Sequence, residues 1–82
     1  MYLPPLQYRI WDIVRRSGTG IRLDALVDRA YADDSEGGPA FAKQSVYVSI
    51  HKLNERLKKI NQRVVCKGSV CRLETIKQSA NG

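Results

Sequence analysis

Phe41 to Ile60 reads FAKQSVYVSIHKLNERLKKI, and its apolar residues are separated by steps of four and three. This spacing keeps side chains on one face of an α-helix. It predicts a single helix over these residues, with a buried stripe on one side and polar side chains on the other. The residues of the predicted stripe are Val46, Ile50, Leu53, Leu57 and Ile60.

Two shorter helices are predicted on the N-terminal side. Leu6–Arg16 has apolar residues at i, i+4, i+7 and i+8 and follows two prolines, which a first helical turn tolerates. Gly18 is suited to the left-handed conformation that ends a helix. A second helix is expected over Leu23–Ala32, and Ile21 and Arg22 before it are too few for more than a short extended link.

A β-hairpin is predicted after the long helix. Residues 63–67 and 70–76 are rich in β-branched side chains, and Gly68-Ser69 between them favours a type II′ turn. This turn pairs Lys67 with Val70 and places the two cysteines opposite each other. The face expected to point inward carries Val64, Cys66, Cys71 and Leu73.

The two cysteines allow two interpretations. In the predicted register Cys66 and Cys71 can form a cross-strand disulfide. In a reducing cytoplasm they are instead small buried apolar residues with free thiols, which is the state we expect. A metal site is not expected, because these cysteines face inward on a different element from His51, the only histidine.

Eighty-two residues are enough for one small domain. We expect this domain to span residues 1–76 and residues 77–82 to form a flexible tail. No apolar run approaches the ~20 residues that cross a bilayer, and the N-terminus lacks a signal-peptide pattern, so a cytoplasmic protein is expected. One histidine, scattered carboxylates and no glycine-rich phosphate loop argue against an enzyme, and no cofactor is expected.

The positive charge is confined to one half of the chain. The formal net charge is +6, to which residues 1–42 contribute −1 and residues 43–82 contribute +7. The asymmetry indicates a polyanionic partner, although lysines that merely keep a helix solvated are the alternative. Nucleic acid is favoured over acidic membrane lipid, because the basic helix uses its apolar stripe for the core.

The predicted order of elements is that of a winged helix-turn-helix: helix, short link, helix, loop, long basic helix and hairpin. The expected fold class is therefore α+β, mainly α, with a three-helix core and a C-terminal hairpin wing. In that fold the third helix enters the DNA major groove, ~12 Å wide, and the hairpin tip reaches the neighbouring backbone. The alternative is a three-helix bundle with an attached hairpin that binds protein.

Three segments also resemble the DNA-binding output domain of OmpR/PhoB-type response regulators. Ser45–Leu57 reads SVYVSIHKLNERL, where the family typically reads TVDVHIxRLRxKL. Ile21–Tyr31 is similar to the second helix of the family, and Lys67–Leu73, KGSVCRL, aligns without gaps to its wing motif RGxGYRL. The resemblance implies sequence-specific binding of double-stranded DNA, transcriptional regulation and, in many members, head-to-tail homodimers on repeated sites.

The chain departs from the family pattern at several positions of these segments. Val70 and Cys71 stand where the wing motif has glycine and tyrosine, and Ser49 and Asn54 replace polar or basic residues of the family helix. We therefore do not expect the base preference of the family here. Without its phosphoacceptor domain, we expect no phosphorylation control either. Residues 33–39 occupy the place where family members can touch RNA polymerase, and a polymerase contact and a plain loop are both open interpretations.

Candidate base-reading residues lie on the polar side of the long helix. Glutamine pairs with adenine, lysine donates to guanine, and the apolar Val48 suits a thymine methyl group. The base-reading candidates are Gln44, Tyr47, Val48, His51 and Lys52. The phosphate-binding candidates, whose charge or hydroxyl suits the DNA backbone, are Lys43, Lys52, Arg56, Lys59, Lys67, Ser69 and Arg72, so Lys52 is a candidate for both roles. Ordinary solvated surface is the alternative for each.

A protein-interaction module is the rival function. Tyr8 and Trp11 extend the apolar side of the helix over Leu6–Arg16, either into the core or toward a protein partner such as RNA polymerase or another regulator. The fold alone does not decide between these functions.

Overall fold

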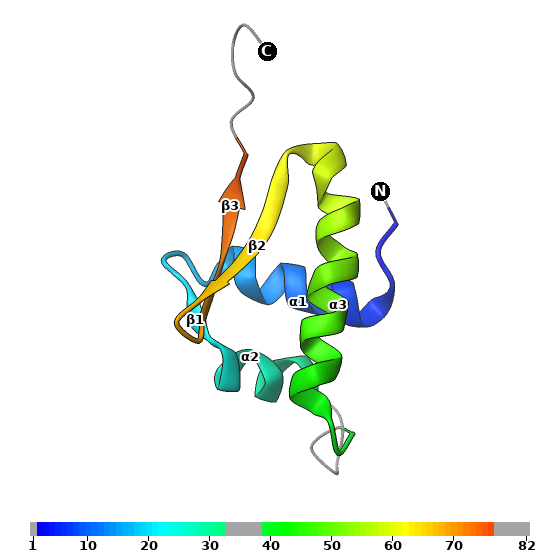
Figure 1. The fold of residues 1–82 in the computed structure, drawn as a ribbon, viewed down its shortest axis with the longest axis vertical. Helices are drawn as coiled ribbons and strands as arrows, with labels where there is room; N and C mark the ends of the chain where they lie inside the picture. Colours follow the sequence, from blue (N-terminus) through cyan, green and yellow to red (C-terminus); the bar gives the residue numbers. More distant parts are fainter. Residues whose placement is uncertain (1, 33–38, 77–82) are drawn as a thin grey trace, which may run out of the picture.

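The computed structural model describes residues 2–32 and 39–76, which form three helices and a three-stranded antiparallel sheet (Figure 1). This is an α+β fold, mainly α, as expected. The expected tail over 77–82 lies outside the described residues. In chain order the elements are α1 (Pro5–Arg16), β1 (Ile21–Arg22), α2 (Leu23–Ala30), α3 (Ala42–Leu57), the 3₁₀ turn η1 (Lys58–Ile60), β2 (Gln62–Lys67) and β3 (Val70–Thr75).

The apolar stripe of α3 faces the core, as its spacing predicts. Val46, Leu53 and Leu57 are fully buried, and Ile50 is nearly so. The prediction for Ile60 is wrong, because its side chain is 41% exposed. Ile60 lies in η1, which packs mainly against β2 and the end of α3 and not beneath α1 and α2, the helices that cover the stripe along α3.

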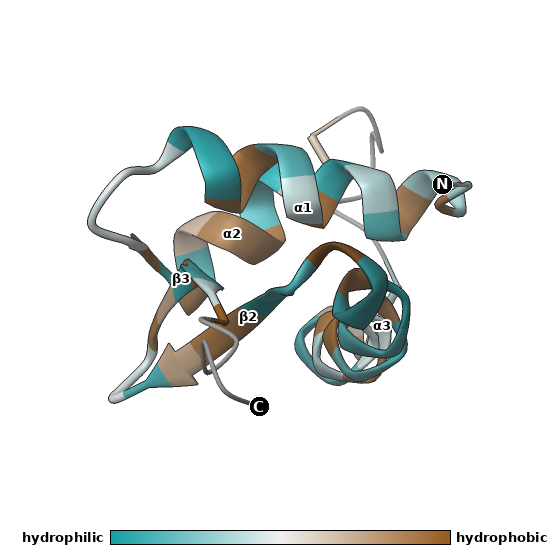
Figure 2. Cartoon of the chain, turned by 90° about the horizontal axis from the view of Figure 1, so that it is seen from above, coloured by the Kyte–Doolittle hydropathy of each residue, from teal (hydrophilic) through white to brown (hydrophobic). Residues whose placement is uncertain are grey.

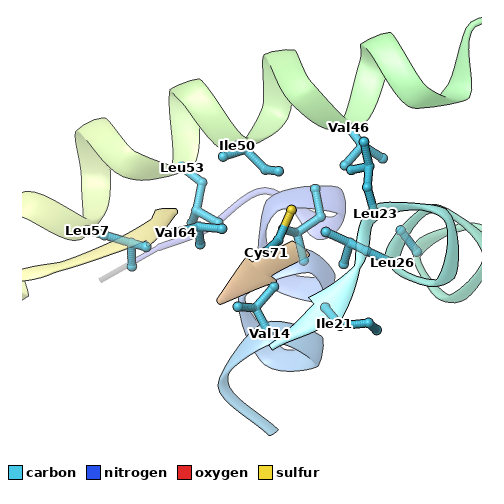
Figure 3. Close-up of a cluster of buried hydrophobic side chains, with 12 residues drawn as sticks. Val14, Ile21, Leu23, Leu26, Val46, Ile50, Leu53, Leu57, Val64 and Cys71 are labelled. Atoms are coloured by element: carbon cyan, nitrogen blue, oxygen red, sulfur yellow. The ribbon is translucent and has the colours of Figure 1, made fainter. Parts of the chain in front are cut away.

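One core joins all three helices and the sheet. Figure 3 shows the side chains of α3 pointing toward residues from α1, α2 and the strands. Viewed from above, α1 lies on one side of the sheet and α3 runs beside β2 (Figure 2). The buried apolar residues are Ile10, Val14, Ile21, Leu23, Leu26, Ala30, Val46, Ile50, Leu53, Leu57, Val64 and Cys71.

Polar contacts fix how α2 meets its neighbours. The Tyr31 hydroxyl, just beyond α2, donates a hydrogen bond to Ser45 Oγ on α3 at 2.9 Å. An Arg9 guanidinium nitrogen on α1 donates to the Ala30 carbonyl at the end of α2 at 3.1 Å. The first contact joins the end of α2 to the first turn of α3, and the second joins α1 to α2.

The expected short extended link before α2 is confirmed, and it also pairs as a strand of the sheet, which was not predicted. Ile21 pairs with Cys71 and Arg22 with Val70, so the strand order of the sheet is β1-β3-β2. Ile21 is buried beneath this pairing. The Leu23 N–H then donates to the Ser69 carbonyl at 2.8 Å, which holds the tip of the hairpin against the start of α2.

Gly20 is required where the chain passes under β3. Its φ is +136°, and a Cβ on it would lie 2.8 Å from Val70 Cγ1 and 3.2 Å from the Cys71 carbonyl oxygen. Gly18 also has a positive φ, +57°, as its place after α1 predicts, but a Cβ there would meet open space. A side chain is therefore disfavoured by the positive φ at both positions. Only at Gly20 would it also clash with neighbouring atoms.

We expect Gly20→Ala to lower the free energy of unfolding by about 1–2 kcal/mol more than Gly18→Ala. Gly18 has the φ of the left-handed helical region, which alanine can adopt at a modest cost, whereas the φ of Gly20 lies outside that region, and only Gly20→Ala adds a clash with a backbone carbonyl and a side chain. Urea unfolding followed by circular dichroism measures the difference. Equal losses in the two variants would show that β1 does not pack against β3 as described.

The hairpin has the predicted register but a different turn. Lys67 pairs with Val70 and Cys66 with Cys71, as expected. Gly68 has φ 59° and Ser69 has φ 66°. Positive φ at both central residues is the signature of a type I′ turn, so the type II′ prediction is wrong. The type I′ turn matches the right-handed twist of paired strands, and the bond from Leu23 to the Ser69 carbonyl holds it in place.

Cys66 and Cys71 form a disulfide, which corrects the expectation of free thiols. The two residues are directly opposite in the ladder, with their Cα atoms 3.9 Å apart. Such close spacing is typical of a non-hydrogen-bonded antiparallel pair, in which the side chains approach each other. The predicted register therefore brings the two sulfur atoms together.

Candidate nucleic-acid interface

The outer side of α3 is exposed and carries all five base-reading candidates. Because Val46, Ile50 and Leu53 face the core, the residues between them point away from it. Two of the outward side chains have large apolar or aromatic surfaces: Tyr47 is 46% exposed and Val48 is 55% exposed. The remaining exposed candidates on this side are Gln44, His51 and Lys52, joined by the phosphate candidate Lys59.

Asn54 identifies the flank of α3 that meets the hairpin. Its Nδ2 donates to the Val64 carbonyl at 3.0 Å, and its Oδ1 accepts from the Val64 N–H at 2.7 Å. Tyr47 lies two helical turns before Asn54 and shares its flank. Arg56 follows Asn54 by two residues, about 200° around the helix, and so lies on the opposite flank, away from the hairpin. Arg56 also follows Lys52 by four residues, so these two cations are neighbours on the flank of α3 that faces away from the hairpin.

The role of Asn54 was missed in the sequence, where it counted only as a departure from a family pattern. Val64 and Leu73 form a non-hydrogen-bonded pair, two positions from the close pair of the cysteines. The N–H and carbonyl of Val64 therefore point to the free edge of β2, where Asn54 binds both. One sequence signal could have predicted this role. Asn54 is a polar residue beside the apolar stripe of its helix, and this helix is followed directly by an edge strand.

The phosphate candidates divide into paired and unpaired cations. Lys43 Nζ lies 3.8 Å from Asp24 Oδ1, and Arg72 donates to Glu74 Oε2 at 3.0 Å. Within residues 2–32 and 39–76, no carboxylate forms an ion pair with Lys52, Arg56, Lys59 or Lys67. Lys67 and Ser69 are exposed at the hairpin tip. Among the phosphate candidates, the uncompensated positive charge thus lies on α3 and at the hairpin tip.

Glu74 is the acidic residue of the hairpin and bridges two arginines. Arg63 donates to Glu74 Oε1 at 2.6 Å, and Arg72 approaches the other oxygen. The hydrogen bond and the charge of Arg63 hold the pKa of Glu74 below its ordinary value, with a smaller contribution from Arg72. Glu74 is therefore ionised at neutral pH and offsets part of the positive charge of the hairpin.

Tyr8 and Trp11 form an aromatic pair on the flank of α1. Trp11 is partly buried, donates from Nε1 to Gln62 Oε1 at 3.1 Å, and has the Arg15 guanidinium 5.0 Å above its ring. Tyr8 lies 5.9 Å from Trp11 between ring centroids and remains 50% exposed. Trp11 therefore belongs to the fold, whereas Tyr8 is available to a protein partner. The proposed polymerase contact at 33–39 falls almost wholly outside the described residues.

Among residues 2–32 and 39–76, no group of three or more His, Cys, Asp or Glu side chains is arranged to hold a metal ion. None of the helices in this part of the chain combines the length and the apolar character needed to cross a membrane. In comparisons with protein-family models, curated proteins and solved structures, no match to this chain was found.

Proposed function

We propose that this protein is a winged-helix transcriptional regulator that binds specific double-stranded DNA in the cytoplasm. The single observation that carries the proposal is the outer side of α3, where uncompensated lysines accompany directional polar groups and the exposed Val48. An α-helix with side chains is about 10–12 Å across and fits the major groove, ~12 Å wide. The lysines supply affinity, and the shorter side chains read base edges.

The arrangement of the sheet supports the same proposal. β1 pairs with β3 and Asn54 binds β2, so the hairpin is fixed both to the start of α2 and to α3. With α3 in the major groove, the tip residues Lys67 and Ser69 lie on the adjacent backbone. A second copy on a repeated site would increase affinity by coupling two such contacts.

Titration of a labelled duplex at two salt concentrations tests the proposal. We expect binding to weaken steeply with salt, because each neutralised phosphate contributes a slope of about −0.9 in log K against log salt. The complex with a duplex that has been selected from a random pool should persist when competitor DNA of random sequence is added. The absence of any complex at low salt would overturn the proposal.

Single substitutions on α3 separate base reading from phosphate binding. Lys59→Ala should weaken binding to all sequences to a similar degree. Gln44→Ala and His51→Ala should each cost about 1–3 kcal/mol on the selected site and little on other sequences. Parallel titrations of selected and random duplexes give these values. Equal losses on every sequence for all three variants would remove the base-reading assignment.

A protein-interaction module is the second candidate function, and the exposed ring of Tyr8 beside Trp11 favours it. This surface lies on α1 and does not use the outer side of α3. If the protein forms no complex with duplex DNA at low salt but binds RNA polymerase or another regulator, and Tyr8→Ala abolishes that binding, this function replaces the first.

A further inference from the structure

The outer face of the sheet carries an excess of positive charge contributed by all three strands. Opposite residues in an antiparallel pair lie on the same face, and neighbours along a strand alternate between faces. Val64, Cys66, Cys71 and Leu73 pack inward against the core. The residues of the outer face are therefore Arg22, Arg63, Val65, Lys67, Val70, Arg72 and Glu74.

This face points to the same side of the molecule as the outer side of α3. Both α3 and the sheet pack against α1. Figure 1 shows α3 and the hairpin side by side in front of α1, and the view from above places α1 behind both (Figure 2). A duplex that approaches the outer side of α3 therefore also passes the outer face of the sheet.

The geometry points to the outer face of the sheet as a second phosphate-binding surface, which holds the duplex backbone beside the groove that α3 occupies, with Glu74 as its internal counter-ion. The inference rests on the proposed function. Two of its arginines, Arg22 and Arg63, were not among the sequence-predicted contacts. Together with Lys67 and Arg72 they extend the contact from the hairpin tip across the sheet.

The chemistry of this face suits phosphates of a duplex and not bases of a single strand. Arginine presents a planar fork of donors that matches phosphate oxygens in bidentate geometry. The apolar residues between the cations are Val65 and Val70, and none of the seven outer-face residues is aromatic. Single-strand surfaces combine cations with aromatic rings on which bases stack. The outer face therefore contributes sequence-independent affinity.

Glu74 competes with the DNA backbone for two of these arginines. Its carboxylate accepts from Arg63 at 2.6 Å and from Arg72 at 3.0 Å, and its pKa is held low, mainly by Arg63. A phosphate that binds either arginine must displace this carboxylate or lie close to its negative charge. Glu74 thus limits how strongly the free protein attracts DNA of any sequence.

Glu74→Gln and Arg22→Ala test the inference from opposite directions. Glutamine keeps a hydrogen-bond acceptor for the arginines but removes the charge, so Glu74→Gln should bind random duplex about threefold to tenfold more tightly, with a steeper salt dependence. Arg22→Ala should weaken binding by a similar factor on every sequence and reduce the slope by about 0.9. Fluorescence anisotropy at several salt concentrations measures both quantities.

Arg16→Ala is the matched control, because Arg16 is an exposed arginine on α1 that already pairs with Asp12. It should bind like the unchanged protein. Thermal unfolding of each variant establishes that the fold is intact, and Arg63→Lys provides a second probe that keeps the charge but loses the bidentate fork. This variant should weaken binding less than Arg63→Ala.

The outcomes separate this inference from the proposed function. If Lys59→Ala weakens duplex binding while Glu74→Gln and Arg22→Ala behave like the unchanged protein, the second surface is disproved and the proposed function stands. If Glu74→Gln weakens binding, the counter-ion role of Glu74 is disproved. If the unchanged protein binds no duplex at all, the proposed function and the second surface both fail.

Discussion

Asn54→Ala should lower the free energy of unfolding by about 2–3 kcal/mol. The substitution removes the hydrogen-bond partners of both the N–H and the carbonyl of Val64, which lie in the partly buried seam between α3 and β2. Each buried backbone group left without a partner costs about 1–3 kcal/mol. For a domain of this size, the expected loss lowers the unfolding temperature by roughly 10–20 °C. Urea and thermal unfolding followed by circular dichroism measure both values.

Lys52→Ala is the matched control for Asn54→Ala. Lys52 lies on the same helix but on its exposed outer side, with no ion pair among the described residues, so its removal should change stability by less than about 0.5 kcal/mol. If Asn54→Ala is as stable as Lys52→Ala, the amide does not hold the edge of β2. In that case the fixed angle between hairpin and α3 loses its main support.

Local patterns were enough to predict the three helices, with ends displaced by up to three residues, and the register of the hairpin. The stripe on α3 depends on spacing within one element, and each of its residues up to Leu57 is buried. Gly18 adopts the left-handed conformation that its place after the first helix predicts. The pairing of Lys67 with Val70 follows from a two-residue turn. In all these cases the deciding contacts lie close together in the sequence.

Features that depend on distant residues were not predictable in the same way. The two residues of β1 form a strand only because β3, near the other end of the chain, offers a free edge. The type I′ turn at Gly68-Ser69 is held in part by a bond to Leu23. Ile60 fits the periodicity of the stripe, yet it lies past the helices that cover the rest. An apolar residue in the repeat is buried only if another helix or strand covers it, and the spacing within one helix does not show whether such an element is present.

The candidate site shows the same division between local and distant information. The exposed position of Gln44, Val48 and His51 follows from the helical wheel alone. The helical wheel does not show which cations are already paired with a carboxylate. Asp24, the partner of Lys43, belongs to α2, and Glu74 pairs with Arg63 across the hairpin as well as with Arg72. Counting lysines and arginines in the sequence therefore overestimates the charge available to a partner.

The double variant Lys52→Ala/Lys59→Ala should weaken binding to any duplex about 60-fold near 0.1 M salt. Both lysines are exposed on the outer side of α3 and have no ion pair among the described residues. Two lost phosphate contacts reduce the slope of log K against log salt by about 1.8, and this slope sets the factor at a given salt concentration. Anisotropy titrations from low to moderate salt give both numbers. Removing two unpaired cations should have a larger effect on affinity than the other substitutions that probe phosphate contacts.

Arg15→Ala/Arg16→Ala separates the position of these charges from their number. It removes the same net charge from α1, which lies behind α3 and the sheet (Figure 1), and both arginines already pair with Asp12. We expect less than a threefold loss of affinity, because Asp12 already offsets part of this charge and α1 is not among the elements proposed to contact the duplex. Equal losses in the two double variants would mean that overall charge, and not the outer side of α3, attracts the DNA. The assignment of α3 to the major groove would then lose its physical basis.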